Sequence, residues 1–450
     1  MTTQRVEEKV RETLHAVALD QVRAPGDLAQ QVVRRRGRRR FSQAAGAAVA
    51  VAAIAAGAML GPWGSGAGEQ DRPVRPAASP QGWHPWQSNV AGGSERGCLA
   101  DGSALYCSGS KYDVVKMDAN TGERLWSVKV NGGGDGMDHP FAVRDGVVYA
   151  YRNHTAEHRP DGDYAGGTDV MAVDAATGRR LWSVKMPQDD RTGQAALLID
   201  GALWANTPSL HTMSALDLRT GETKWSHTWA KGEVCQRAVL SGVPYLLCSP
   251  DTEDVHDTDL LRLDPATGKA HKVTTLPGRQ QLLGTSKNRM VLAGTADTAA
   301  DDFQLTSVDG SGTRTSLPDQ PKGRTATWAV ADDRLISVSW KGRACAYSLT
   351  TGKTLWTGPV GVTMPDKDGT ASLASPVVST RQATVYFFSP AGDLSGLDLR
   401  TGEQVWHAHL DTGRPQPGGL SDTPQLQLYQ DVLIARNGSR IVSLLPPTGH

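Results

Sequence analysis

One ten-residue pattern recurs along this chain of 450 residues and restricts the folds that the chain can adopt. Each copy places an Asp or another polar residue before a Thr-Gly pair, and a Trp four residues after the Gly. A unit that returns at a fixed period of roughly 20–50 residues is the signature of a repeat architecture. Five copies read "MDANTGERLW", "VDAATGRRLW", "LDLRTGETKW", "YSLTTGKTLW" and "LDLRTGEQVW", and they end at Trp126, Trp182, Trp225, Trp356 and Trp406.

The period of the repeat favours a ring of small sheets. The Thr-Gly glycines are Gly122, Gly178, Gly221, Gly268, Gly352, Gly402 and Gly449. A worn copy, "VDGSGTRTSL", divides the one double-length gap near Gly312, so that most intervals are 40–50 residues. Propeller blades have this period, at about 40–50 residues each. We therefore predict an all-β, eight-bladed β-propeller of four-stranded antiparallel blades, or seven blades if the copy near Gly312 is not a blade.

The pattern has a physical interpretation within one blade. In "DVMAVDAATGRRLWSVKM", residues 169–186, "VMAVD" alternates as a half-buried strand, Gly178 supplies the positive φ of a tight turn, and "RRLWSV" is the returning strand. A Trp at this fixed position can fill the seam between two blades. We therefore predict structural rather than chemical roles for Asp118, Gly122, Trp126, Asp174, Gly178, Trp182, Asp217, Gly221, Trp225, Gly352, Trp356, Asp398, Gly402 and Trp406.

The Ala-x-Asp-x-x-Thr-Gly-x-x-x-Trp pattern resembles the tryptophan-docking repeat of the PQQ-like (quinoprotein-type) β-propellers. The copies around Asp174 and Asp217 match it in full, whereas Lys116 and Gly396 replace the Ala of two others, and Lys272 replaces a Trp. The resemblance covers about residues 82–449. That family includes quinone-dependent dehydrogenases, outer-membrane-assembly lipoproteins and sensor ectodomains, so the resemblance implies the fold more firmly than the function.

The resemblance leaves three functional hypotheses: a non-catalytic binding scaffold, a sensor ectodomain that signals through residues 1–40, and a quinone-dependent enzyme. The enzymes of the family generally use two adjacent, mutually bonded cysteines, a bound Ca²⁺ and a catalytic Asp. This chain has no Cys-Cys pair, and it contains no Gly-x-Ser-x-Gly, His-Glu-x-x-His or phosphate-loop motif. We therefore expect a non-catalytic scaffold with no catalytic residue and no cofactor, and assign no cofactor-binding residues.

The two ends of the repeat region predict how the ring closes. The last copy, "IVSLLPPTGH", ends at His450 with no returning strand, and an unpaired sheet edge is a liability. A spare strand, "GWHPWQSNV" at 82–90, carries Trp83 and Trp86. We expect this N-terminal strand to complete the last blade.

The N-terminal part divides into three segments. Six arginines in "RRRGRRR" precede an uncharged run of 19 residues at 44–62, close to the ~20 that a membrane-spanning helix requires. Arginines on one side place the N-terminus in the cytoplasm. We predict a basic cytoplasmic tail with a short amphipathic helix (1–41), a transmembrane signal anchor (42–63) and a Gly/Pro-rich linker (64–80), before a propeller at 81–450.

An alternative interpretation of the N-terminus is an export signal. Arg38-Arg39-Arg40-Phe41 resembles a twin-arginine motif, and Ala56-Gly57-Ala58 is a possible cleavage site, in which case the protein is secreted. Otherwise it is a single-pass membrane protein with an extracytoplasmic propeller. Residues 1–41 have a net charge of +5 and the remainder −5, so the propeller has no basic excess with which to bind nucleic acid. We expect a monomer.

Four of the five cysteines flank two-residue hairpin turns. Counted outward from Gly102-Ser103, Cys98 and Cys107 form the fourth pair, and Cys235 and Cys248 form the sixth pair around Ser241-Gly242. Both are non-hydrogen-bonded pairs, with Cα atoms ~4.5 Å apart, within the range that a disulfide spans. We predict bonds Cys98–Cys107 and Cys235–Cys248, as in an oxidising extracytoplasmic compartment, and a free Cys345.

The lengths of the connections indicate which face binds a partner. The turns between the first and second strands of a blade, and the Thr-Gly turns, are short. The connections between the second and third strands, and those between blades, are long and share one face. We expect a protein partner to bind on that face. Two polar clusters on long connections contain residue types that can bind metal ions, but such residues are usually only solvated, and we predict no metal site. The clusters are His154, His158, Asp161, Asp163 and Asp169, and Asp297, Asp301 and Asp302.

Overall fold

A computed structural model describes residues 78–129, 140–154, 157–159, 162–164, 167–187, 195–252, 254, 256–286, 288–295, 304–317, 325–365, 372–411 and 423–446. The regular structure of these residues is β-strand, and none of them belongs to a helix that could cross a membrane. The expected amphipathic helix, the transmembrane anchor and nearly all of the linker lie outside the described residues.

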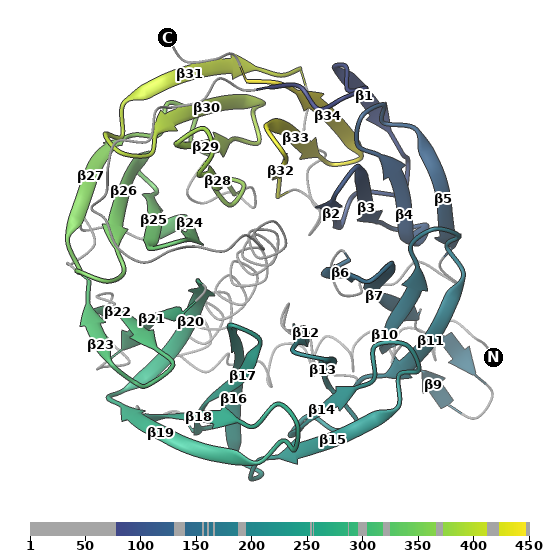
Figure 1. The fold of residues 1–450 in the computed structure, drawn as a ribbon, viewed down its shortest axis with the longest axis vertical. Coiled ribbons are helices and arrows are strands. Elements are labelled where there is room, and N and C mark those ends of the chain that lie inside the picture. Colours follow the sequence, from purple (N-terminus) through teal and green to yellow (C-terminus); the bar gives the residue numbers. More distant parts are fainter. Residues whose placement is uncertain are drawn as a thin grey trace, which may run out of the picture. The chain divides into compact units, whose positions relative to one another are not determined.

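The strands form eight four-stranded antiparallel sheets that follow one another around a ring (Figure 1). Blade 1 contains β2 (Gly97–Asp101), β3 (Ala104–Ser108), β4 (Tyr112–Asp118) and β5 (Arg124–Lys129); blade 2 contains β6 (Ala142–Arg144), β7 (Val147–His154), β10 (Gly167–Asp174) and β11 (Arg180–Lys185); blade 3 contains β12 (Ala196–Ile199), β13 (Ala202–Asn206), β14 (Thr212–Leu216) and β15 (Thr223–Thr228); blade 4 contains β16 (Glu233–Leu240), β17 (Val243–Pro250), β18 (Thr258–Leu263) and β19 (Ala270–Leu276).

The second half of the ring repeats the same order of strands. Blade 5 contains β20 (Arg279–Thr285), β21 (Arg289–Thr295), β22 (Gln304–Asp309) and β23 (Arg314–Ser316); blade 6 contains β24 (Thr325–Ala331), β25 (Arg334–Ser339), β26 (Arg343–Ser348) and β27 (Thr354–Pro359); blade 7 contains β28 (Val377–Ser379), β29 (Thr384–Phe388), β30 (Asp393–Asp398) and β31 (Gln404–His409); blade 8 contains β32 (Gln425–Tyr429), β33 (Val432–Asn437), β34 (Arg440–Leu444) and β1 (Trp86–Asn89). The worn copy near Gly312 is thus a complete blade, which confirms eight blades and excludes seven.

Blade 8 combines strands from both ends of the chain. β1 pairs antiparallel with β34, with Trp86 opposite Ser443 and Asn89 opposite Arg440. Figure 1 shows β1 beside β34 at the outer edge of this blade. The predicted closure by the N-terminal strand is therefore present, and it supplies the returning strand that the last repeat lacks.

The hydrophobic core consists of the seams between blades. The middle strands β3, β13 and β29 are buried along their whole length, because a neighbouring blade covers each face. The outer strands β5 and β31 have no fully buried residue and are half-buried on alternate residues. One cluster joins Tyr149 and Val170 of blade 2 to Leu203 of blade 3, and another joins blades 8 and 1.

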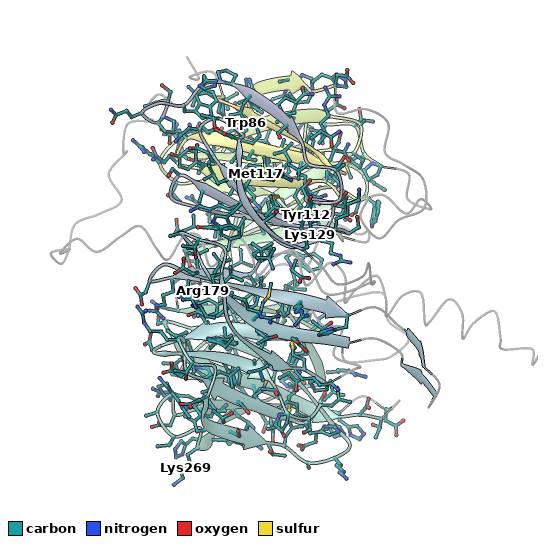
Figure 2. All side chains as sticks on the ribbon, turned by 90° about the vertical axis from the view of Figure 1, so that its right-hand side faces the viewer. Trp86, Tyr112, Met117, Lys129, Arg179 and Lys269 are labelled. Atoms are coloured by element: carbon teal, nitrogen blue, oxygen red, sulfur yellow. A yellow bond between two sulfur atoms is a disulfide. The ribbon has the colours of Figure 1, made fainter. Side chains whose placement is uncertain are left out.

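The two ends of the blades carry different connections. We call the end with the first-to-second and third-to-fourth strand turns the short-turn face; its turns are 102–103, 119–123, 145–146, 175–179, 200–201, 217–222, 241–242, 264–269, 286–288, 310–313, 332–333, 349–353, 380–383, 399–403 and 430–431. We call the other end, with the second-to-third strand and blade-to-blade connections, the long-loop face. Figure 2 shows Arg179 and Lys269 toward the short-turn face, and Tyr112 and Lys129 toward the long-loop face.

Candidate binding face

The repeated Asp builds the third-to-fourth strand turn. The Asp174 carboxylate accepts hydrogen bonds from the backbone N–H groups of Ala176 and Thr177 and from the Thr177 hydroxyl, at 3.1, 2.8 and 2.8 Å. Asp118, Asp217, Asp264 and Asp398 make equivalent bonds to their turns. A side chain that accepts local N–H bonds in this way fixes a turn without help from the rest of the fold.

These bonds also set the pKa of the turn carboxylates. The backbone N–H groups of Arg219 and Thr220, followed by Lys224, lower the pKa of Asp217 from 3.8 to about 2. Hydrogen bonds to the Thr177 hydroxyl and N–H lower the pKa of Asp174, and those to the N–H groups of Ala266 and Thr267 lower the pKa of Asp264. The carboxylates are thus stabilised in their charged form by the turn that they cap.

The repeated Trp joins each blade to the Thr-Gly turn of the next. The Trp182 indole N–H donates to the Leu218 carbonyl at 3.1 Å, and the Trp356 indole donates to the Leu399 carbonyl at 2.8 Å. Trp126, Trp225 and Trp86 donate in the same way to carbonyls of the following blade, at 3.2, 2.8 and 2.9 Å. Trp86 of β1 therefore takes the place of the missing repeat Trp of blade 8.

In five of the third-to-fourth strand turns, the Gly makes room for the Trp of the preceding blade. At Gly178, φ is +74°, and a Cβ would lie 2.8 Å from the Trp126 ring. Gly221 meets Trp182 at the same distance, and Gly122, Gly268 and Gly402 meet Trp86, Trp225 and Trp356. Both the backbone conformation and the close approach of the indole therefore require Gly. Gly449, the expected partner of Trp406, lies outside the described residues.

No repeat Trp joins the outer strand of blade 5 to either neighbouring blade. Hydrogen bonds of its first strand, β20, join it to these blades instead. The Gln236 side chain of β16 donates to the Gln280 carbonyl at 2.6 Å and accepts from the Leu282 N–H at 2.7 Å, both in β20. From the other side, the Trp328 indole of β24 donates to the Leu283 carbonyl at 2.7 Å. The inner strand of blade 5 is thus bonded to both neighbours, which the repeat pattern did not predict.

The closing seam between blades 8 and 1 uses similar bonds. Gln425 accepts from the Cys98 N–H at 2.9 Å, and Gln427 donates to the Cys98 carbonyl. Arg436, only 3% exposed, donates to the carbonyls of Glu95 and Thr423, both at 2.9 Å. These side chains join blade 1 to blade 8 near the inner strands, whereas β1 joins the two blades at the outer edge of the ring.

Both predicted disulfides are present. Cys98 lies directly opposite Cys107, and Cys235 directly opposite Cys248, in the register that the hairpin count predicts. The Cα atoms are 4.0 and 4.1 Å apart. Cys345 is a free, buried thiol. The Cys98–Cys107 bond lies in the closing seam, because Gln425 and Gln427 bind the backbone of Cys98.

A ribbon extends the long-loop face at blade 2. β7 and β10 pair up to His154 and Gly167, and beyond them β8 (Glu157–Arg159) pairs with β9 (Gly162–Tyr164). In Figure 2 this ribbon projects from the side of Tyr112 and Lys129.

A histidine–carboxylate contact lies at the base of the ribbon. His154 Nε2 is 3.0 Å from an Asp169 carboxylate oxygen, which also accepts from the Ser183 hydroxyl at 2.9 Å. The side chains of His158, Asp161 and Asp163, and residues Asp297, Asp301 and Asp302, lie outside what the structure describes. Within the described part of the chain, no three His, Cys, Asp or Glu side chains are grouped as metal ligands.

Exposed apolar side chains lie at both ends of the blades. Among the described residues, five large apolar side chains are exposed. Leu210, 39% exposed, and Val234, 40% exposed, lie at the long-loop ends of the neighbouring blades 3 and 4. The other three, Leu125, Leu355 and Val405, are the second residues of the outer strands β5, β27 and β31, and so lie at the short-turn ends of these strands.

An open pocket lies on the short-turn face between blades 1, 2 and 3. It has a volume of about 520 Å³, and charged side chains of both signs line it, among them Lys116, Asp145, Asp174, Arg179 and Arg219. The Lys116 ammonium is already bonded to a backbone carbonyl of blade 2 at 2.7 Å. Since carboxylates alternate with cations, the pocket has no strong preference for a charged ligand of either sign.

Comparison with known proteins gives the family to which these features correspond. Residues 72–237, 110–296 and 301–450 match the PQQ-like family described as outer membrane protein assembly factor BamB. Three solved structures are similar: BamB from Moraxella catarrhalis (15% identity, covering 80% of this chain and 98% of that one, TM-score 0.51), the computationally designed protein Ika8 (12%, 81% and 98%, 0.52) and apo AztD from Citrobacter koseri (13%, 74% and 88%, 0.50). At these identities the likeness is one of fold.

A curated protein is also similar over part of the chain. The serine/threonine-protein kinase AfsK of Streptomyces coelicolor is 29% identical over 209 residues, which is 40% of this chain. The match spans 24% of the kinase, so the chain covers about a quarter of that relative's length.

Proposed function

This chain belongs to the PQQ-like β-propeller family described as outer membrane protein assembly factor BamB, and from this premise we propose its function. We propose that the chain is a membrane-anchored, extracytoplasmic scaffold that binds another protein on its long-loop face. The contrast between the connections of the two faces carries the proposal. The long-loop face bears the longer connections and the ribbon of β8 and β9, whereas the turns of the short-turn face contain two to six residues each. Long loops on a rigid scaffold are where binding usually occurs, and Leu210 and Val234 are exposed on the same face.

The compartment follows from different observations. Two disulfides persist in an oxidising compartment, and an uncharged run of 19 residues follows six arginines. We therefore place the propeller outside the cytoplasm and residues 1–41 inside. We also propose that the propeller is not catalytic; the absorbance of purified protein incubated with pyrroloquinoline quinone and Ca²⁺ should equal the sum of its components.

Photocrosslinking in intact cells tests the scaffold. A photoreactive amino acid at Leu210 or Val234 should give covalent adducts with another protein, because both positions are exposed on the long-loop face. The same residue at Lys269 or Lys353, on the short-turn face, serves as the matched control and should give none. Adducts from the control positions alone, or from no position, would contradict the proposal.

A second candidate function is a sensor ectodomain that signals through residues 1–40. The partial similarity to a serine/threonine-protein kinase favours it. In that case a cytoplasmic protein should co-purify with the full chain and be lost when residues 1–33 are deleted. Retention of the same proteins after the deletion would remove this candidate.

A further inference from the structure

The chain enters the propeller on the short-turn face. The Ala78 N–H donates to the Asp431 carboxylate at 3.0 Å, and Asp431 lies in the β32–β33 turn. Six residues later, the His84 N–H points to the carbonyl of Asn120, in the β4–β5 turn of blade 1. Residues 78–84 therefore run along the short-turn rim of blades 8 and 1.

The point of entry is fixed to the ring by two tryptophans. The Trp83 indole donates to the Ser443 hydroxyl at 2.8 Å, and the Trp86 indole donates to the Ala119 carbonyl at 2.9 Å. β1 then runs from Trp86, opposite Ser443, to Asn89, opposite Arg440 beside the β33–β34 turn of the long-loop face. The strand thus begins at the short-turn face and ends at the long-loop face.

The tether that precedes residue 78 has a length comparable to the height of the blades. Fifteen residues, 63–77, separate the apolar run from Ala78, and they are rich in Gly and Pro. A flexible chain of this length has a mean end-to-end distance of about 20–25 Å. Strands of six to eight residues, at about 3.3 Å per residue, separate the two faces by a similar distance. The face that carries the tether is therefore held closer to the membrane than the other.

We infer that the propeller is held with its short-turn face toward the membrane and its long-loop face directed away from it. This inference rests on the membrane anchor of the proposed function. It deepens that function by naming the kind of partner: a soluble protein or domain that approaches from the aqueous side, rather than a protein embedded in the same membrane. The exposed side chains of Leu210 and Val234 would then be presented to that aqueous side.

Energy transfer from labelled positions to lipid head groups tests this orientation. Two pairs of exposed residues lie at opposite ends of a single strand: Lys341 and Lys353 flank β26, and His256 and Lys269 flank β18. Each is changed singly to Cys (for example Lys353→Cys) in a full-length Cys345→Ser background, because Cys345 is the one free thiol among the described residues. The labelled protein is inserted into phosphatidylcholine–phosphatidylglycerol vesicles that carry a head-group acceptor.

The expected result is a larger loss of donor fluorescence at Lys353 and Lys269 than at their partners Lys341 and His256. Lengthening the linker with Gly and Ser should reduce this difference, and detergent should abolish it. Equal transfer within both pairs, or greater transfer at Lys341 and His256, overturns the orientation. Flotation of the vesicles distinguishes a wrong orientation from a missing membrane anchor. Protein that does not float with the vesicles shows that the anchor is wrong, and the orientation is then rejected with it.

Discussion

In five of the third-to-fourth strand turns, a single glycine meets two requirements, a left-handed backbone and space for an indole. At Gly178, Ala would be strained by the φ of +74°, and its Cβ would lie 2.8 Å from the Trp126 ring. Gly201 is the matched control, since its φ is +71° but a Cβ there would meet no atom within 4 Å. We expect Gly201→Ala to lower the free energy of unfolding by about 1–2 kcal/mol, from strain alone.

The substitution Gly178→Ala should cost about 1–3 kcal/mol more, because the indole must also move. Urea denaturation of both variants measures this difference. An equal loss of stability in the two proteins would show that the Trp126 ring moves aside at little cost. The contact of this ring with the turn of blade 2 would then contribute little to stability.

The turn carboxylates predict how the protein responds to acid. The pKa of Asp217 is about 2 in the folded chain and ordinarily 3.8, so the folded state favours the charged form. Its contribution to stability is therefore complete above pH 3.8 and is lost as the pH falls toward 2. In Asp217→Asn the amide oxygen can still accept the turn N–H bonds but does not titrate. The melting temperature of this variant should fall less steeply between pH 5 and 2; a slope identical to that of the parent protein would contradict the assignment.

At the scale of one element, β1 should decide whether the ring is stable. Each of its ladder bonds contributes about 0.5–1.5 kcal/mol, and the burial of Trp86 contributes about 1.5–3 kcal/mol more. Typical domain stability is only about 5–15 kcal/mol. A protein that starts at residue 91 should therefore be insoluble or melt at a much lower temperature than one that starts at residue 78. Equal melting temperatures of the two proteins would show that the strand is dispensable.

The disulfides make a second prediction at this scale. Peptide mapping without reductant should recover the Cys98–Cys107 and Cys235–Cys248 linkages, with Cys345 as a free thiol. Replacing Cys98 and Cys107 together by Ser should lower the free energy of unfolding by about 2–4 kcal/mol. A linkage that involves Cys345 would show that the hairpin register is wrong.

At the scale of the whole molecule, the prediction concerns topology. Cysteines introduced one at a time into residues 64–77 should react with an impermeant maleimide added to intact cells. Those introduced into residues 1–33 should react only after lysis, because the arginines at 34–40 hold that side in the cytoplasm. Labelling of both segments in intact cells would exclude the membrane anchor.

The sequence predicted the parts of the ring that follow a local rule. The period of the Thr-Gly turns gives eight blades, the missing last strand indicates the pairing of β1, and strand alternation places the cysteines opposite each other. The inner seams follow no such rule. Gln236 and Arg436 are not part of the repeated pattern. Arg436 donates a hydrogen bond to the carbonyl of Glu95, which lies 341 positions away in the sequence. Only the closed ring brings such residues together, so no repeat pattern identifies them.

The position of the closing strand also determines how the ring bears mechanical load. Trp86 of β1 lies opposite Ser443 of β34, so that the N-terminal end of one strand and the C-terminal end of the other are adjacent. Force applied between these ends would peel the pair apart one hydrogen bond at a time, instead of shearing all of its bonds together. Pulling residue 78 against residue 446 should therefore open the ring at low force, beginning at the Trp83–Ser443 contact.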